Sequence, residues 1–355
     1  MLIYFSCAIL SSLIAFIGTQ TKQYKEGKRA LVIILSALPL YLLSAYRYNV
    51  GSDYQSYKSI FDILSTGHAI EDMDIGFVFL CKVIMFFGGD FYTMLHVTSL
   101  IFIGFTFYYI FYESPYPFFS VYLLFAMQYY FASFNGIRQM CGAAILLFSL
   151  KYVKDKKFIP FIICVLAAAS FHGTCLVFIP VYWFDKFKIR PFIIFIISVI
   201  VLVFGDSIAG IINRIMINTK YSYYAEVGGD GNTRIIWTLV QVAIVIFASY
   251  YYRKETKYSL FYNLQIMTMW LSFLNADVSW IVRMQWTFGV PGIICIPYII
   301  SKSNIKSNKI IYFLVISILF SIDIYLTAVR GKHDVLPYLT YLTNQYTGIK
   351  TRHVP

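Results

Sequence analysis

A few ionisable side chains interrupt a chain that is otherwise strongly apolar. They lie inside or at the mouth of apolar runs: Arg47, Asp53, Lys82, His96, Arg138, His172, Asp277, Arg283 and Asp323. A charge at the centre of a membrane helix costs about 2.5–3.5 kcal/mol on insertion scales, so each of these needs a structural or chemical reason. Arginine binds phosphate, and histidine and aspartate transfer protons. These residue types together indicate anion binding combined with acid–base chemistry.

The elements that must position them are membrane helices. Of the 355 residues, 59% are hydrophobic and 13% are charged, whereas soluble domains carry about 25% charged residues. This excludes an ordinary cytosolic enzyme, a nucleic-acid-binding domain and a disordered protein. Apolar stretches of bilayer-spanning length recur from end to end. They predict an all-α, polytopic transmembrane bundle of about 11–12 helical segments, with residues 1–355 forming a single domain.

The distribution of basic residues predicts how the chain crosses the bilayer. Five connectors hold most of the lysines and arginines: 22–29, 151–157, 186–190, 253–257 and 302–309. The positive-inside rule makes them cytoplasmic. The N-terminus, segments 47–74 and 206–234 and the tail after 329 are then external. Residues 158–183 must form a hairpin that turns near 171–173, and the short run 75–87 is predicted to be re-entrant or to reach half depth.

This topology brings several of the ionisable residues to one side of the membrane. Arg47, Asp53, Arg138, His172 and Arg283 come from four separate parts of the chain, and all are predicted to lie near the external surface. Because that surface lacks basic loops, their convergence is the main functional signal in the sequence.

The segment Arg47-Tyr-Asn-Val-Gly-Ser-Asp-Tyr54 contains the first group. Gly51 permits a tight turn or a close backbone approach. A helix that starts near Ser52 or Asp53 would place Asp53 and Tyr57 on one face. The alternative is a capped loop in which Arg47 extends to the membrane interface.

Three further groups follow along the chain. In Asn-Gly-Ile-Arg-Gln at 135–139, Arg138 falls in the first turn of a helix, where it could clamp an anion or anchor the helix at the interface. His172, at the predicted hairpin turn, could act as an acid–base group or serve as a structural residue. Arg283 follows Trp280 one turn into an apolar run.

Two external segments remain open to more than one interpretation. Segment 206–234 could form an interfacial helix and a lid, or an ordinary loop. The tail carries Arg330, His333 and Asp334, and it could be only a solvated end. The six cysteines lie in apolar runs without a C-x-x-C pair, which favours buried small residues over metal or disulfide roles.

Taken in order, these motifs resemble the EpsG and Wzy-type bacterial membrane polysaccharide polymerases. The resemblance covers residues 45–300 and has five parts: R-Y-N-V-G-S-D-Y-x-x-Y at 47–57, I-G-F-V-F-L at 75–80 after an acidic stretch, F-N-G-I-R-Q at 134–139, F-H-G-T at 171–174 and W-x-x-R at 280–283. Ser52 stands where threonine is expected, and Gly173-Thr174 where Ser-Ala is common. Neither difference affects an ionisable group.

The resemblance implies a fold similar to GT-C glycosyltransferases and a multi-pass protein of the bacterial inner membrane. Such an enzyme transfers a growing glycan from undecaprenyl pyrophosphate to a new lipid-linked repeat unit on the external (periplasmic) face, without metal or cofactor. Its partners would be the lipid-linked oligosaccharide, the bilayer and a chain-length regulator, but no nucleic acid.

The same resemblance suggests roles for individual residues. Arg47, Arg138 and Arg283 would neutralise the negative charge of the pyrophosphate. Further substrate contacts would come from Gln139, Tyr54 and Tyr57. His172 is the favoured catalytic base for the acceptor hydroxyl, and Asp53 would either orient it or act as the base.

Two other functions compete with the polymerase. A lipid-linked oligosaccharide flippase or another transporter predicts ionisable residues near the midplane between related halves, but the sequence shows no repeat. A membrane polysaccharide acyltransferase would also use histidine and arginine. Its donor comes from the cytoplasm, so it predicts a site facing the cytoplasm or a channel.

Overall fold

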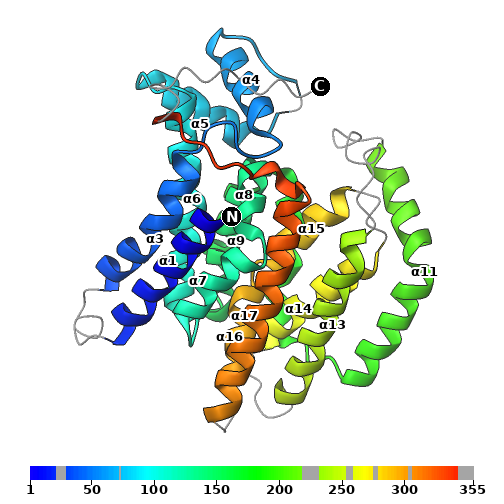
Figure 1. The fold of residues 1–355 in the computed structure, drawn as a ribbon. Helices are drawn as coiled ribbons and strands as arrows, with labels where there is room; N and C mark the ends of the chain where they lie inside the picture. Colours follow the sequence, from blue (N-terminus) through cyan, green and yellow to red (C-terminus); the bar gives the residue numbers. More distant parts are fainter. Residues whose placement is uncertain are drawn as a thin grey trace. The chain divides into compact units, whose positions relative to one another are not determined.

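A computed structural model describes residues 1–20, 29–71, 73–217, 232–252, 259–274, 279–302 and 306–342. Helices make up this part of the chain, which confirms the predicted all-α fold (Figure 1). Its one pairing of extended backbone is an isolated antiparallel bridge between Arg47 and Thr340. Of the predicted external segment 206–234, residues 206–217 continue the helix α11 (Pro191–Ile217), and residues 218–231 lie outside the described residues. The basic connectors 22–29 and 253–257 lie wholly or largely outside them as well.

The described chain divides into two compact units. Unit 1 comprises Met1–Tyr112, Pro117–Cys141 and the described residues from Ile311 onward, and unit 2 comprises Glu113–Tyr116 and Gly142–Ile310. The sequence shows no break in composition at these boundaries, so the division follows from packing. Each unit is described by itself.

Unit 1 contains the helices before residue 141, together with most of the last long helix and the short helix that follows it. They are α1 (Leu2–Gln20), α3 (Arg29–Ala45), α4 (Tyr54–Ser65), α5 (Ile75–Phe86), α6 (Phe91–Glu113), α7 (Pro117–Ala126), α8 (Tyr129–Asn135), the first turn of α9 (Ile137–Lys154), α17 (Lys306–Val329) and the short 3-10 helix η3 (Lys332–Asp334). Within the unit, α1 packs against α3 and α7, α4 against α5, and α8 against η3.

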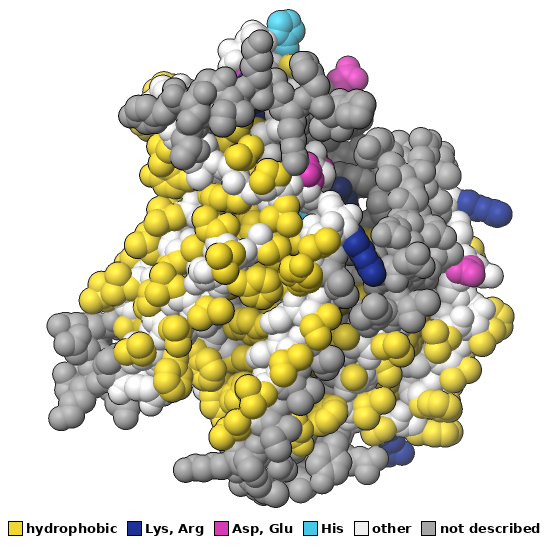
Figure 2. All heavy atoms as spheres, viewed as in Figure 1, with side chains coloured by type: hydrophobic (Ala, Val, Ile, Leu, Met, Phe, Trp, Pro, Cys, Tyr) yellow, Lys and Arg dark blue, Asp and Glu magenta, His cyan; other side chains and the backbone are white. Residues whose placement is uncertain are grey.

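Small residues let α1 approach its neighbours closely. Its buried stripe is Tyr4, Ala8, Ser11 and Ala15, and the Ser11 hydroxyl donates to the carbonyl of Ser36 in α3. Small side chains on one helical face are typical of packed membrane helices. The opposite faces of α1 and α3 carry exposed large hydrophobic side chains, and Figure 2 shows hydrophobic side chains gathered over these helices. An exposed face of this kind suits contact with lipid.

Three helical stretches in the described residues are long and apolar enough to cross a membrane. They are Leu2–Gln20, Phe91–Glu113 and Pro191–Ile212. The helices Ile281–Gly289 and Gly292–Ser301 meet this criterion together and are bent by 44°, as in a broken span or a re-entrant loop. Several shorter apolar helices accompany them, because runs that look continuous in the sequence are divided by breaks.

Segment 47–74 and the run after it form two short helices that lie side by side, α4 and α5 (Figure 1). At 1.5 Å per residue, the 12 residues of α5 are about 18 Å long, which is less than the hydrocarbon thickness of a bilayer. The predicted short helix at 75–87 is therefore confirmed. Its depth in a membrane stays a prediction.

Unit 2 contains the remaining helices. They are the rest of α9, α10 (Phe158–Phe171), the 3-10 helix η1 (Gly173–Lys186), α11 (Pro191–Ile217), α13 (Asn232–Tyr252), α14 (Ser259–Phe273), α15 (Ser279–Gly289) and α16 (Gly292–Ser301). Almost every residue of α14 is buried, and this helix packs against α11, α13, α15, α16 and η1. It is the central helix of the unit.

The predicted hairpin at 158–183 is present in unit 2. Helix α10 ends at Phe171, His172 is extended with φ −156° and ψ 113°, and η1 begins at Gly173. The rings of Phe158 and Phe161, near the start of α10, lie 4.9 and 5.4 Å from the ring of Tyr182, near the end of η1. The two helices are therefore antiparallel, as the charges of the flanking loops predict.

Candidate functional site

A tight turn after α3 positions the first motif. Asn49 and Gly51 have positive φ angles of 49° and 107°, and α4 begins at Tyr54. A Cβ added at Gly51 would lie 2.7 Å from Oδ1 of Asn135. The turn therefore needs glycine both for its backbone angle and for its contact with the second motif, as the sequence predicts.

The second motif lies at the break between α8 and α9. Helix α8 ends at Asn135, Gly136 breaks the helical geometry with ψ 55°, and α9 begins at Ile137. Arg138 is therefore in the first turn of α9, as predicted. Near a helix N-terminus, the free backbone N–H groups and the helix dipole favour anions.

The C-terminal segment 331–342 joins these two motifs. The N–H of Tyr48 donates to Leu339 O at 2.9 Å, and the N–H of Gly51 donates to Asp334 O at 2.9 Å. Nδ2 of Asn135 donates to Nδ1 of His333 at 3.1 Å. The segment is packed onto the site motifs, so it is not the solvated end that the sequence left open. His333 and Asp334 have positive φ angles, a feature that concentrates at functional sites.

Arg138 has a carboxylate partner that the sequence did not assign to it. Its Nη1 lies 2.7 Å from Oδ2 of Asp74, and the side chains are 16% and 4% exposed. The backbone N–H of Arg138 donates to the Tyr57 hydroxyl at 3.4 Å. Burial raises the pKa of the Tyr57 phenol, while the charge of Arg138 opposes that shift. Arg138, Asp74 and Tyr57 therefore form one polar cluster.

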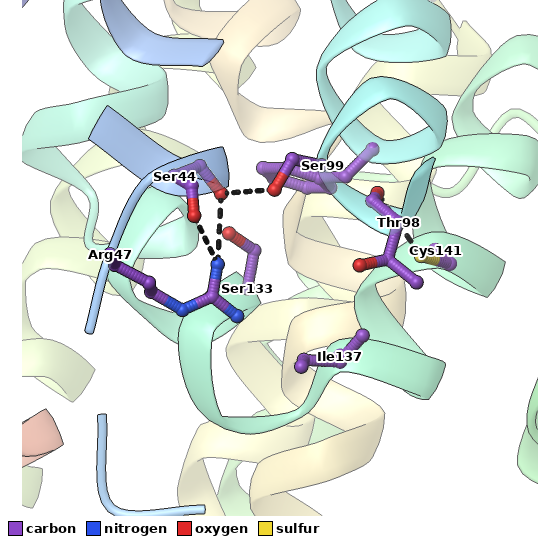
Figure 3. A pocket seen from close by; sticks show the side chains of 8 residues that line it. Ser44, Arg47, Thr98, Ser99, Ser133, Ile137 and Cys141 are labelled. Carbon is purple, nitrogen blue, oxygen red and sulfur yellow. Dashed lines mark hydrogen bonds between the residues drawn. The ribbon is translucent and has the colours of Figure 1, made fainter. Parts of the chain in front are cut away.

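Arg47 has a different environment, because it is 1% exposed. Its Nη1 donates to the carbonyl and, at 3.3 Å, to the hydroxyl of Ser44, and the guanidinium lies 4.7 Å from the centre of the Phe134 ring. Figure 3 shows the guanidinium pointing toward Ser44, Ser99 and Ser133, beside a small cavity with room for about one water molecule. Within the described residues, Nε has no hydrogen-bond partner.

The charge of Arg47 is not balanced by a carboxylate in the described part of the chain. Burial lowers the pKa of its guanidinium to about 10, so the group stays positive at neutral pH. A pyrophosphate cannot reach it in this conformation, because the cavity beside it is too small. The guanidinium of Arg47 is therefore enclosed in this conformation, and its role towards the pyrophosphate stays a prediction.

The remaining predicted residues of unit 1 are unequally accessible. Asp53 occupies the N-cap position of α4 without a side-chain capping bond; its Oδ1 accepts from the Ser52 hydroxyl at 3.2 Å. Tyr54 is buried, with its ring 5.2 Å from that of Phe91. Gln139 is also fully buried. Asp53 is partly exposed and is the most accessible of the three.

His172 and Arg283 belong to unit 2. His172 is 2% exposed, and its Nδ1 lies 3.2 Å from the hydroxyl of Thr174. Arg283, in α15, lies 5.8 Å from the ring of Trp286. The structure thus places Arg47, Asp53, Tyr54, Tyr57 and Arg138 in unit 1, and of these it brings Tyr57 into contact with Arg138. The convergence of all five predicted residues stays a prediction.

Two other ionisable residues have structural partners within unit 1. The two ring nitrogens of His96 each lie 2.9 Å from a tyrosine hydroxyl, those of Tyr41 and Tyr341. Oδ2 of Asp323 accepts from Nε2 of Gln128 at 2.6 Å, where a left-handed residue separates α7 from α8. These contacts account for polar groups in apolar runs without assigning them chemistry.

The interpretation of the sequence missed Asp74, Asn135 and His333. For Asp74, the available signal was the acidic stretch that ends at this residue, directly before the apolar run 75–80. His333 had no signal beyond its residue type, because nothing local indicates that the tail folds back. Among the described residues, no three His, Cys, Asp or Glu side chains lie close enough to share a metal ion.

Comparisons with known proteins are consistent with the motifs. A search of curated proteins and a search of solved structures each found no match. A family model, described as the EpsG family, matches residues 30–340. The match covers both motifs of unit 1, the hairpin of unit 2 and most of the C-terminal segment. The chain therefore belongs to the EpsG family, and it is a membrane protein of the polysaccharide-polymerase type.

Proposed function

We propose that the protein polymerises lipid-linked oligosaccharide repeat units on the external face of a bacterial inner membrane. Family membership and the apolar helices support a polymerase of this type. The observation that carries the proposal is Arg138, which lies in the first turn of α9 with its guanidinium already oriented by hydrogen bonding. A guanidinium at a helix N-terminus suits a diphosphate group.

The proposed reaction transfers a glycan between two lipid carriers. A hydroxyl oxygen of the acceptor repeat unit forms a bond to the anomeric carbon of the donor glycan. The bond from that carbon to the pyrophosphate oxygen breaks, and the undecaprenyl pyrophosphate leaves with the electron pair. The hydroxyl proton passes to a base, for which His172 and Asp53 are the candidates.

Arg138 stabilises the negative charge that develops on the leaving pyrophosphate. Arg283 is proposed as a second ligand of that group, and Tyr57 as a neighbour of the bound substrate. Arg47 adds a buried positive charge beneath the site, because its surroundings leave no room for direct contact. Tyr54 and Gln139 are buried, so they are proposed to support the site and not to touch the substrate.

Deletion of the gene, followed by complementation, tests the proposal in cells. The deletion strain should carry one repeat unit per lipid on its surface, and the wild-type gene should restore long chains. The Arg138→Ala gene should fail to do so at equal protein levels. Long chains in the deletion strain would contradict the proposal. Repeat units that accumulate only on the cytoplasmic face would indicate a flippase instead.

A further inference from the structure

Asp74 is a buried carboxylate that lies where a helix-capping residue would lie but bonds to an arginine of another helix. It occupies the N-cap position of α5, with extended backbone angles of −65° and 127°. An aspartate there normally accepts a hydrogen bond from the first turn of its helix. Asp74 makes no side-chain capping bond. Its carboxylate instead accepts from Arg138, which is 64 residues away in the sequence.

Stability alone is a weak reason for this ion pair. Both side chains are largely removed from solvent, at 4% and 16% exposure. Desolvation of two charges offsets most of their attraction, so buried ion pairs can often be replaced by apolar residues without loss of stability. An arginine and an aspartate held 2.7 Å apart therefore call for a second explanation.

The contacts around Arg138 restrict how its side chain can move. Asp74 holds Nη1 from the start of α5, and the Tyr57 hydroxyl in α4 accepts from the backbone N–H. The Tyr57 ring also lies 5.7 Å from that of Phe77 in α5, which links the two helices. Since an arginine side chain otherwise samples many rotamers, the bond from Asp74 to the guanidinium reduces the entropy lost when this side chain binds an anion.

We propose that Asp74 is the positioning residue of Arg138: it fixes the guanidinium in the orientation in which this group meets the diphosphate of the lipid-linked donor. This inference rests on the proposed function. It gives Asp74 two opposing effects, because its negative charge repels the substrate while its hydrogen bond orients the arginine.

These opposing effects predict a kinetic signature. In Asp74→Asn the repulsion is removed and the orientation is weakened. We expect kcat for polymerisation to fall about 10- to 100-fold, as for other residues that orient a ligand-binding group. KM should stay level or fall, because the net charge near the diphosphate becomes more positive. Asp74→Glu keeps the charge and should recover part of kcat.

The matched control is a second aspartate ion pair in the same external segment. Lys58 Nζ lies 2.7 Å from Asp62 Oδ2 in α4, and both side chains are exposed. Asp62→Asn therefore removes a pair of the same length that does not contact Arg138, and it should leave kcat and KM unchanged. Rates are expressed per folded protein, measured by thermal unfolding in the same detergent.

The exchange Asp74→Arg with Arg138→Asp separates positioning from simple pairing. It keeps an ion pair between α5 and α9 but moves the guanidinium to the other helix. We expect the double variant to recover the melting temperature that each single variant loses, without recovering polymerisation. Recovered polymerisation would overturn the inference, and so would a kcat for Asp74→Asn within about twofold of wild type.

The test also separates this inference from the proposed function. If Arg138→Ala polymerises at the wild-type rate, the proposed role of Arg138 fails, and the role of Asp74 fails with it. If Arg138→Ala is inactive while Asp74→Asn keeps its kcat and KM, only the positioning role is overturned.

Discussion

Arg47 and Arg138 have similar positions in the sequence, but their side chains have different environments in the structure. Both lie at the end of an apolar run, and local sequence does not separate an anion ligand from a buried charge. Arg138 is partly exposed and shares a cluster with Asp74 and Tyr57. Arg47 is buried against Ser44 and the Phe134 ring. Two substitutions test whether these environments correspond to different roles.

Arg138→Lys is expected to polymerise more slowly than wild type by about 10- to 100-fold, and Arg138→Ala by about 100- to 1,000-fold. Lysine keeps the charge but loses the planar fork that can bind phosphate through two hydrogen bonds. The measurement is the rate of chain extension by purified protein. Arg330→Lys, at an exposed arginine, is the control. Equal rates for all three variants would exclude Arg138 from the reaction.

Arg47→Met is expected to unfold no more easily than wild type, and its free energy of unfolding could rise by up to about 4 kcal/mol, because a buried charge without a carboxylate partner is removed. Polymerisation should nevertheless fall about tenfold as the positive charge beneath the site is lost. Thermal unfolding and chain extension are measured on the same preparation. A lower melting temperature with normal extension would make Arg47 a packing residue.

At the level of elements, three segments that are distant in sequence meet in unit 1. They are the turn at 49–53, the break between α8 and α9, and the C-terminal segment 331–342. The turn and the break were predictable, since Gly51 and Gly136 mark them locally. The return of the C-terminal segment was not, because its backbone bonds to Tyr48 and Gly51 depend on tertiary packing and leave no periodic pattern.

Gly51→Ala tests how tightly the turn and the helix break are packed. Its left-handed backbone alone should cost about 1–2 kcal/mol, and the clash with Asn135 should add about 1–3 kcal/mol. Gly88→Ala is the matched control, since Gly88 also has a positive φ of 74° but open space around it. Melting temperatures of the two variants give the comparison. If the two variants lose the same amount of melting temperature, the contact between the turn and Asn135 adds nothing to the destabilisation.

Unit 2 shows an element that sequence reasoning could predict in full. Residues 158–183 are flanked by two basic connectors, and a chain that leaves and re-enters on one side must turn. The structure has that turn at His172. The pairing of Asp74 with Arg138 could not be predicted in the same way. Many carboxylates could pair with an arginine, and the choice depends on the packing of α4 and α5 around the start of α9.

For the whole molecule, the charge distribution predicts an orientation in the membrane. Ser52 and Lys188 are both exposed, and they are predicted to lie on opposite sides of the bilayer. Single cysteines at these positions, in a chain whose six native cysteines are replaced, provide the test. A membrane-impermeant thiol reagent is added to cells whose outer layers have been removed and whose inner membrane is intact. The reagent should label position 52 and not position 188. The reverse pattern would place the Arg138 cluster on the cytoplasmic side.

The most direct test of the central claim is chain extension by the purified protein. The protein is reconstituted in lipid vesicles with an undecaprenyl-pyrophosphate-linked repeat unit, and the products are separated by length. The account predicts a ladder of glycans with wild-type protein and a single repeat unit per lipid with Arg138→Ala. A single repeat unit with correctly folded wild-type protein, when the native repeat unit is supplied, would contradict it.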